Sequence, residues 1–250
     1  MELGLHGSLN FIIKHSPSAL STLQRRHITI DVAMGLYAIH KAGFMHGDLK
    51  PDNIIITGHH DPARGIIAKI TDFGGSMETV LKGNKAKHFT PLWAAPEVQN
   101  KDADIDWEKA DVYSYGLVIG SLWGSCRNGL ISWSHGERSS SIFSALAMPV
   151  LDDIESHVIA NDFLWLGKIE DRTINNVKTQ LEHNAIDQSL QNEILELVTT
   201  PLRTHFWLRP DTNALALSLV SFASETGRDI VSEEMANTEA EYSEPDKQVS

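Results

Sequence analysis

The apolar positions of the chain recur mostly with the period of an α-helix. Ile28, Val32 and Leu36 follow an i, i+4, i+8 spacing, and this spacing predicts a helix over residues 21–42. Serine and threonine stand at the start of this range and are common N-cap residues. Gly43 follows directly and can adopt the left-handed conformation that ends many helices. We therefore expect one long helix here.

Three more helices follow from the same kind of pattern. The run Asp111–Trp123 is apolar on every side, which is typical of a buried central helix. Ile186, Leu190 and Ile194 repeat every four residues and predict another. A last helix is expected over residues 211–220, with an aspartate at its cap position.

Strands are few and short. Residues 53–57 and 66–71 are runs rich in β-branched residues, and the turn-rich string GHHDPARG joins them. This arrangement predicts a β-hairpin. The expected fold class is therefore α+β, mainly α-helical with one small hairpin.

Composition and charge narrow the classes of protein. The 250 residues include 21 Lys and Arg against 33 Asp and Glu, a net charge of −12, which argues against a nucleic-acid-binding surface. The single cysteine, Cys126, cannot form an internal disulfide. The longest apolar stretch lies around residues 214–223 and is shorter than a membrane-spanning helix. These observations predict a soluble cytoplasmic protein without a nucleic-acid or membrane partner.

The last part of the chain differs in composition from the rest. Residues 225–250 combine many acidic residues with few bases and few large apolar side chains. Such a segment buries too little apolar surface to offset the entropy of ordering. We expect an acidic disordered tail over this range.

Four short sequence strings around the hairpin carry the candidate chemistry: HGDLKPDN over 46–53, TDFGG over 71–75, TPLWAAPE over 90–97, and DVYSYG from residue 111. The types of residue suit phosphoryl transfer. Asp48 can accept the proton of an attacking hydroxyl, and Lys50 can neutralise charge on the transferred group. Asn53 and Asp72 offer the oxygen ligands that magnesium prefers.

The set of strings resembles the C-terminal lobe of a eukaryotic protein kinase of the serine/threonine type. HGDLKPDN resembles the catalytic loop H-R-D-L-x-x-x-N, TDFG resembles the D-F-G metal motif, and AAPE contains A-P-E. The resemblance implies transfer of the ATP γ-phosphoryl group to a protein serine or threonine. It implies ATP and Mg²⁺ as cofactors, with Asp48 and Lys50 catalytic and with Lys50, Asn53 and Asp72 at the nucleotide and its metals.

The same resemblance implies roles for residues outside the catalytic loop. Residues 72–97 correspond to the activation segment, in which Thr90 lies in the substrate-docking part. Asp111 corresponds to the aspartate that steadies the catalytic loop. Arg209 corresponds to the late arginine that pairs with the A-P-E glutamate, here Glu97.

The first residues, MELGLHGSL, resemble the kinase hinge. Glu2, Leu3 and Gly4 would lie against the adenine, and Ser8 would cap the first helix of the lobe. The resemblance divides the chain into a hinge-like segment 1–7, a kinase-like C-terminal lobe 8–224 and the acidic tail 225–250.

The sequence departs from the pattern of the kinase family in two ways. Gly47 replaces the usual arginine, and no glycine-rich loop or V-A-I-K lysine precedes the hinge-like segment. Several interpretations therefore stay open: a kinase whose upper lobe is missing from the sequence, an inactive kinase-like scaffold, or a chain completed by a partner that covers the open cleft. HGD also occurs in small-molecule phosphotransferases of the aminoglycoside and choline type, which is a further alternative.

Overall fold

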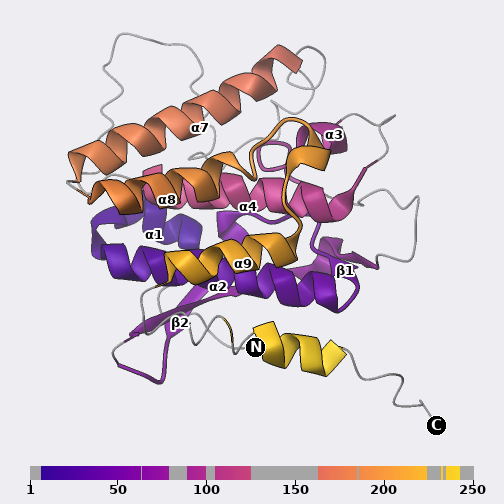
Figure 1. Cartoon of the computed structure of the whole chain (residues 1–250), viewed down its shortest axis with the longest axis horizontal. Helices are drawn as coiled ribbons and strands as arrows, with labels where there is room; N and C mark the ends of the chain where they lie inside the picture. The colour runs from indigo at the N-terminus through magenta and orange to yellow at the C-terminus, as the bar shows by residue number, and fades with distance from the viewer. Residues whose placement is uncertain are drawn as a thin grey trace.

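The computed structural model describes residues 7–62, 64–78, 89–99, 105–124, 163–184, 186–223, 232 and 235–242. Within these ranges the chain is mainly helical, with two small antiparallel sheets, so the predicted α+β class is confirmed (Figure 1). The α-helices are α1 Leu9–His15, α2 Thr22–Lys41, α3 Pro96–Gln99, α4 Trp107–Gly124, α7 Phe163–His183, α8 Gln188–Thr199 and α9 Thr212–Phe222. The strands are β1 Phe44–Met45, β2 Ile54–Gly58, β3 Ile66–Ile70 and β4 Met77–Glu78. Short 3-10 helices are η1 Pro17–Ala19, η2 Pro51–Asn53, η3 Phe73–Gly75 and η4 Phe206–Leu208.

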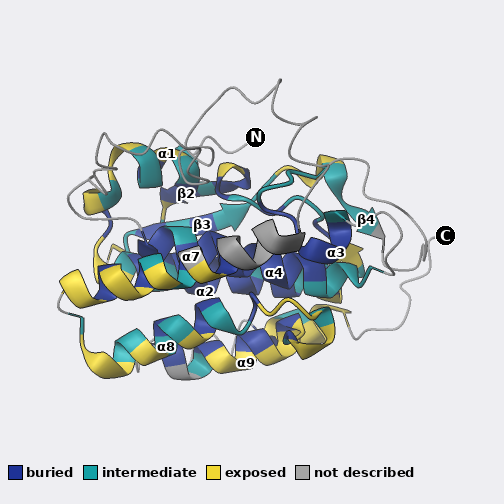
Figure 2. Cartoon of the chain, turned by 90° about the horizontal axis from the view of Figure 1, so that it is seen from above, coloured by how far each residue is buried: buried dark blue, intermediate teal, exposed yellow. Residues whose placement is uncertain are grey.

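Helix α4 forms the centre of the molecule. It packs against α2, α7 and α8, and it is buried along most of its length (Figure 2). Its glycines allow this close approach, because a Cβ atom on Gly120 would overlap the Thr173 methyl group of α7. A Cβ atom on Gly116 would come within 2.8 Å of Pro201. The prediction of a buried central helix is confirmed.

Helix α2 begins and ends where its sequence predicts. Ser21 caps it by accepting a hydrogen bond from the backbone amide of Gln24, and the Gln24 side chain accepts from the Ser21 amide in return. Gly43 has a φ angle of 80° just beyond its end. The predicted boundaries, 21 and 42, are the two cap residues of the observed helix. The expected last helix is also capped as predicted, at Asp211.

The predicted hairpin is β2 with β3. Its register pairs Ile54 with Ile70, one residue away from the start expected for the first strand. A buried carboxylate on α2 fixes the hairpin to that helix, since Asp31 accepts a hydrogen bond of 2.8 Å from the Ala68 amide and pairs with Arg64. The hairpin is therefore fixed to α2. Its open end, formed by the start of β2 and the end of β3, lies next to the catalytic loop.

The C-terminal region differs from the expected disordered tail. Residues 235–242 are helical, Met235 is buried, and Glu239 contacts α2. The burial of Met235 supplies an apolar anchor that the strongly acidic composition had obscured. Residues 224–231 and 243–250 lie outside the described residues. No described helix is both long and apolar enough to span a membrane.

Candidate active site

Asp48 forms a small cluster of hydrogen-bonded polar groups with Lys50 and Thr90. Its Oδ2 atom accepts a hydrogen bond of 2.6 Å from Lys50 Nζ, and its Oδ1 atom accepts one of 2.8 Å from the backbone amide of Thr90. Lys50 Nζ also donates to Thr90 Oγ1 over 2.7 Å. Charge-assisted hydrogen bonds of this length are strong. These hydrogen bonds join the catalytic loop to Thr90, near the end of the segment that precedes α3.

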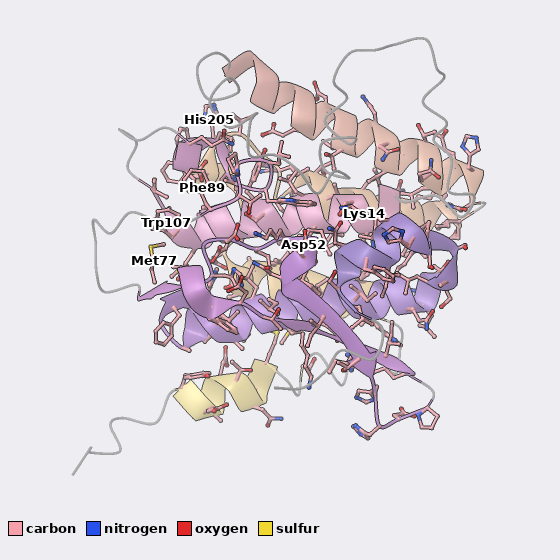
Figure 3. All side chains as sticks on the ribbon, turned by 180° about the vertical axis from the view of Figure 1, so that it is seen from behind. Lys14, Asp52, Met77, Phe89, Trp107 and His205 are labelled. Atoms are coloured by element: carbon pink, nitrogen blue, oxygen red, sulfur yellow. The ribbon has the colours of Figure 1, made fainter. Side chains whose placement is uncertain are left out.

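Asn53 is buried and holds the far end of the same loop. Its amide nitrogen Nδ2 donates to the Asp48 carbonyl over 2.9 Å, and its backbone amide donates to the Lys50 carbonyl over 2.9 Å. The loop joins β1, which pairs with β4 at Met77, to η2, which contains Asp52 (Figure 3 labels both residues). The side-chain oxygen of Asn53 could therefore serve as a ligand atom.

The hairpin brings Asp72 to the side of Asn53. The pairing of β2 with β3 continues as a hydrogen bond of 2.8 Å from the Thr71 amide to the Asn53 carbonyl. Asp72 follows directly, in a left-handed conformation with φ 64°, and its carboxylate is exposed. Left-handed aspartates are uncommon and occur where the surrounding structure holds them. Asn53 and Asp72 thus lie side by side at one end of the hairpin, where their side-chain oxygens could bind a cation.

Asp111 orients the start of the catalytic loop. Its Oδ2 atom accepts from the His46 amide over 2.8 Å, and its Oδ1 atom accepts from the Gly47 amide over 2.9 Å. His40 Nε2 lies 2.9 Å from the same Oδ2 atom, and His40 Nδ1 lies 3.3 Å from Thr212 Oγ1. The sequence analysis missed His40. Its place in the last turn of the helix before the loop is the one signal that could have found it.

Gly47 allows the two segments of the site to meet. Its φ angle is 78°, and an added Cβ atom would lie 3.3 Å from the Gly75 carbonyl oxygen and 3.7 Å from the methyl carbon of Met77. A side chain here would therefore meet strained backbone and crowding together. The rings of His46 and Phe73 lie 5.7 Å apart across the same junction.

Glu97 and Arg209 form the predicted ion pair, and both side chains are buried. Arg209 Nη1 donates to Glu97 Oε1 over 2.6 Å, and Nη2 donates to Oε2 over 3.0 Å. The remaining donors of the guanidinium reach the backbone carbonyls of Arg203, Thr204 and Lys109. A fully satisfied bidentate pair of this kind fixes α3 to the loop before α9.

A second buried carboxylate lies beside this pair and was not found from the sequence. Glu170 of α7 accepts a hydrogen bond of 3.0 Å from Thr204 Oγ1. Burial raises the pKa of Glu170, while the Thr204 hydrogen bond and the Arg209 charge oppose that rise. Burial likewise raises the pKa of the Tyr113 hydroxyl, whose ring lies 4.8 Å from the Arg209 guanidinium carbon. No local sequence pattern distinguishes Glu170 from the exposed acids of the chain.

The expected adenine-binding residues Glu2, Leu3 and Gly4 lie outside the described residues, as do residues 79–88 of the expected activation segment. The structure thus brings together Asp48, Lys50, Asn53, Asp72 and Thr90 in one region. Glu97 with Arg209 forms a separate structural cluster.

Comparison with known proteins assigns the family. Residues 1–158 match the model of the protein kinase domain, and the chain belongs to the protein kinase family. It is 33% identical over 118 residues to a probable serine/threonine-protein kinase, gdt8, of Dictyostelium discoideum. It is 35% identical over 120 residues to the serine/threonine-protein kinase CLA4 of Candida albicans, and 31% identical over 126 residues to the dual specificity protein kinase shkA of Dictyostelium discoideum.

These similarities cover part of each protein. The matched stretch is 47% of this chain for gdt8 and for CLA4, and 48% for shkA. It spans only 9%, 12% and 22% of the lengths of those relatives. The domain match over residues 1–158 nevertheless establishes the family, and the kinase-like fold that the motifs predicted is confirmed.

Proposed function

We propose that this chain acts as a protein serine/threonine kinase, which transfers the γ-phosphoryl group of ATP to a serine or threonine hydroxyl of a protein substrate. One observation carries the proposal: the Asp48 carboxylate is bonded on one oxygen to Lys50 at 2.6 Å and on the other to the Thr90 amide at 2.8 Å. These hydrogen bonds hold the Asp48 carboxylate between Lys50 of the catalytic loop and the Thr90 segment. A base in a fixed position suits phosphoryl transfer, which depends on how the reacting groups are placed.

Asp48 is the proposed general base. It accepts the proton of the substrate hydroxyl as that oxygen bonds to the γ-phosphorus, and the bond from phosphorus to the bridging oxygen of ADP breaks. Lys50 is bonded to the base and keeps a cationic ammonium beside it, where it stabilises charge on the transferred group. Thr90, bonded to both, would place the substrate segment next to Asp48.

Asn53 and Asp72 are the proposed magnesium ligands. The Asn53 amide nitrogen is engaged by the Asp48 carbonyl, so the amide presents its oxygen. Bound Mg²⁺ would neutralise the phosphate charges and hold them in line for the displacement. Magnesium in such sites takes one or two protein carboxylates and completes its coordination with phosphates and water.

The backbone of Glu2, Leu3 and Gly4 is proposed to contact the adenine, as the family resemblance implies. Glu97, Asp111 and Arg209 serve this proposal as supports. Asp111 holds the amides of the catalytic loop, and the Glu97–Arg209 pair holds α3, which follows the Thr90 segment. Neither support needs to touch a substrate.

The test is an assay of phosphate transfer from labelled Mg-ATP to a generic protein substrate, with Asp48→Asn compared with Asp52→Asn. Both variants lose one carboxylate charge from the same loop, and Asp52 is exposed and bonded to Asn10. Asp48→Asn is expected to lower the rate by about 10²–10⁴-fold, the usual contribution of a general base. Asp52→Asn should retain the rate. Full activity of Asp48→Asn would contradict the proposal.

Binding is measured separately from chemistry. Mg-ATP is expected to raise the melting temperature of the wild-type chain and of Asp48→Asn, because the Asp48→Asn substitution removes no proposed metal ligand. Asp72→Ala should abolish that rise. If Mg-ATP stabilises neither the wild type nor Asp48→Asn, the chain lacks a working nucleotide site and the kinase proposal fails.

A further inference from the structure

The last turn of α2 presents a binding site for a carboxylate. Tyr37 and Lys41 lie four residues apart on this helix, and Lys41 Nζ lies 5.3 Å from the centre of the Tyr37 ring. Both side chains reach the same oxygen of Glu239. The Tyr37 hydroxyl donates to Glu239 Oε1 over 3.1 Å, and Lys41 Nζ lies 3.9 Å from that atom.

Residues 235–242, which supply Glu239, form a short helix with one buried and one exposed face. Met235, four residues earlier, is 8% exposed and belongs to the hydrophobic core, and Thr238 is half-buried. Residues three and four apart share one face of a helix. Ala236 and Asn237 on the other face are exposed. Figure 1 shows this segment, 235–242, in yellow beside α2.

The same turn of α2 also supports the catalytic loop. His40 lies between Tyr37 and Lys41 in the sequence and points inward, where its Nε2 atom is 2.9 Å from Asp111. Asp111 in turn accepts hydrogen bonds from the His46 and Gly47 amides. One helical turn therefore contacts residues 235–242 on its outer face and the support of the catalytic loop on its inner face.

We propose that residues 235–242 form a releasable latch, which docks in cis on the Tyr37–Lys41 site and stiffens the turn of α2 that holds Asp111 and the catalytic loop. The site takes an acidic helix with an apolar residue four positions before a glutamate. This inference concerns the fold and does not depend on the kinase activity.

The contacts suit release rather than permanent packing. Met235 is the one buried residue of 235–242, and the contacts of Glu239 include a hydrogen bond and an ion pair whose Lys41 and Glu239 side chains are 38% and 56% exposed. Exposed ion pairs contribute little and are screened by salt. Segments with few buried contacts open locally, before the rest of the molecule unfolds.

The first test is hydrogen exchange of the full chain, with Glu239→Gln compared with Glu241→Gln. Both substitutions remove one negative charge from the same exposed segment, so net charge is matched. Glu239→Gln is expected to speed exchange of the amides in residues 37–47 by about two- to fivefold, because glutamine can still accept the Tyr37 hydrogen bond but no longer carries the charge that pairs with Lys41. Glu241→Gln should exchange like the wild type. Equal exchange in the two variants would overturn the latch.

The second test supplies the segment in trans. A labelled peptide of residues 232–245 is titrated against the full-length Met235→Asp variant, whose own segment can no longer bury its anchor. The peptide is expected to bind this variant at least tenfold more tightly than it binds the wild type, where the site is already occupied. The same peptide with Glu239→Gln should bind weakly. Equal binding to both proteins, or no binding to Met235→Asp, would overturn the proposal.

The cis arrangement is tested by dilution. Exchange of residues 37–47 in the wild type should not depend on protein concentration, because the latch and its site belong to one chain. Protection that disappears on dilution would show that a second copy supplies the segment, and it would overturn docking in cis.

Discussion

Arg209 contacts both carboxylate oxygens of Glu97, at 2.6 and 3.0 Å, across 112 positions of sequence. The Arg209 side chain is fully buried, and all of its remaining donors reach backbone carbonyls. Such a pair tolerates the loss of neither partner, because the remaining charge would be buried without compensation. This relationship gives the first prediction for the stability of the lobe.

Arg209→Ala should lower the free energy of unfolding by about 3–5 kcal/mol, the usual effect of removing one member of a buried ion pair. Urea unfolding at neutral pH measures the change. Arg203→Ala serves as the control, because Arg203 is exposed and its guanidinium donates to the Leu208 carbonyl. That control should cost less than about 1 kcal/mol. Similar losses in the two variants would contradict a special role for the pair.

Gly120→Ala tests the packing of α4 against α7. The added methyl group would overlap the Thr173 methyl, so the substitution should destabilise the chain by about 1–3 kcal/mol despite the better helix propensity of alanine. Thr173→Ser removes that methyl group. The double variant should therefore be more stable than the sum of the single changes allows. Strictly additive effects in urea unfolding would show that the two positions do not touch.

Glu170→Gln tests the buried carboxylate beside Arg209, Thr204, Tyr113 and Asp171. The pKa of Glu170 in the folded state is raised above its ordinary value of 4.5, chiefly by burial. Its contribution to stability is therefore complete below pH 4.5 and is lost as pH rises through the raised pKa.

Glutamine keeps the shape and the hydrogen bond to Thr204 but does not ionise. Relative to the wild type, Glu170→Gln should become more stable as pH rises from 4.5 to 8, which urea unfolding at several pH values measures. A difference between the two proteins that does not change with pH would refute this assignment.

The contribution of His27 to the free energy of unfolding should depend on pH in the opposite direction from that of Glu170. Burial lowers its pKa in the folded state below the ordinary value of 6.5, and the Arg64 charge lowers it further. The unfolded chain then binds more protons than the folded chain just below pH 6.5, so the free energy of unfolding falls as pH decreases through that range. His27→Gln should flatten this slope while leaving the stability at pH 8 little changed. Histidine NMR titration gives the same pKa directly, and a value at or above 6.5 would disprove the prediction.

The local elements of this protein were predictable because their causes lie within a few residues. The spacing of Ile28, Val32 and Leu36 and the cap at Ser21 place α2 correctly. The hairpin was predicted with a shift of one residue at its first strand. The kinase motifs follow the same logic, since Asp48 and Asn53 lie on one short loop whose spacing brings them together.

Other features had no such local signal. His40 lies 71 residues from Asp111 in sequence, and nothing near it indicates that partner. Glu170 is one acid among many, and it is the packing of α7 on α4 that removes it from water. Residues 235–242 have the composition of a solvated tail, yet they are helical, with Met235 buried in the core and Glu239 in contact with Tyr37 and Lys41 of α2.

Short-range patterns along the chain thus account for helices α2, α4, α8 and α9, the hairpin, the motifs and the family. The partners of His40, Glu170 and Glu239 depend on how helices meet. The physical reason is that hydrophobic period and capping act within one or two turns, whereas burial and pairing of charges depend on surfaces distant in sequence.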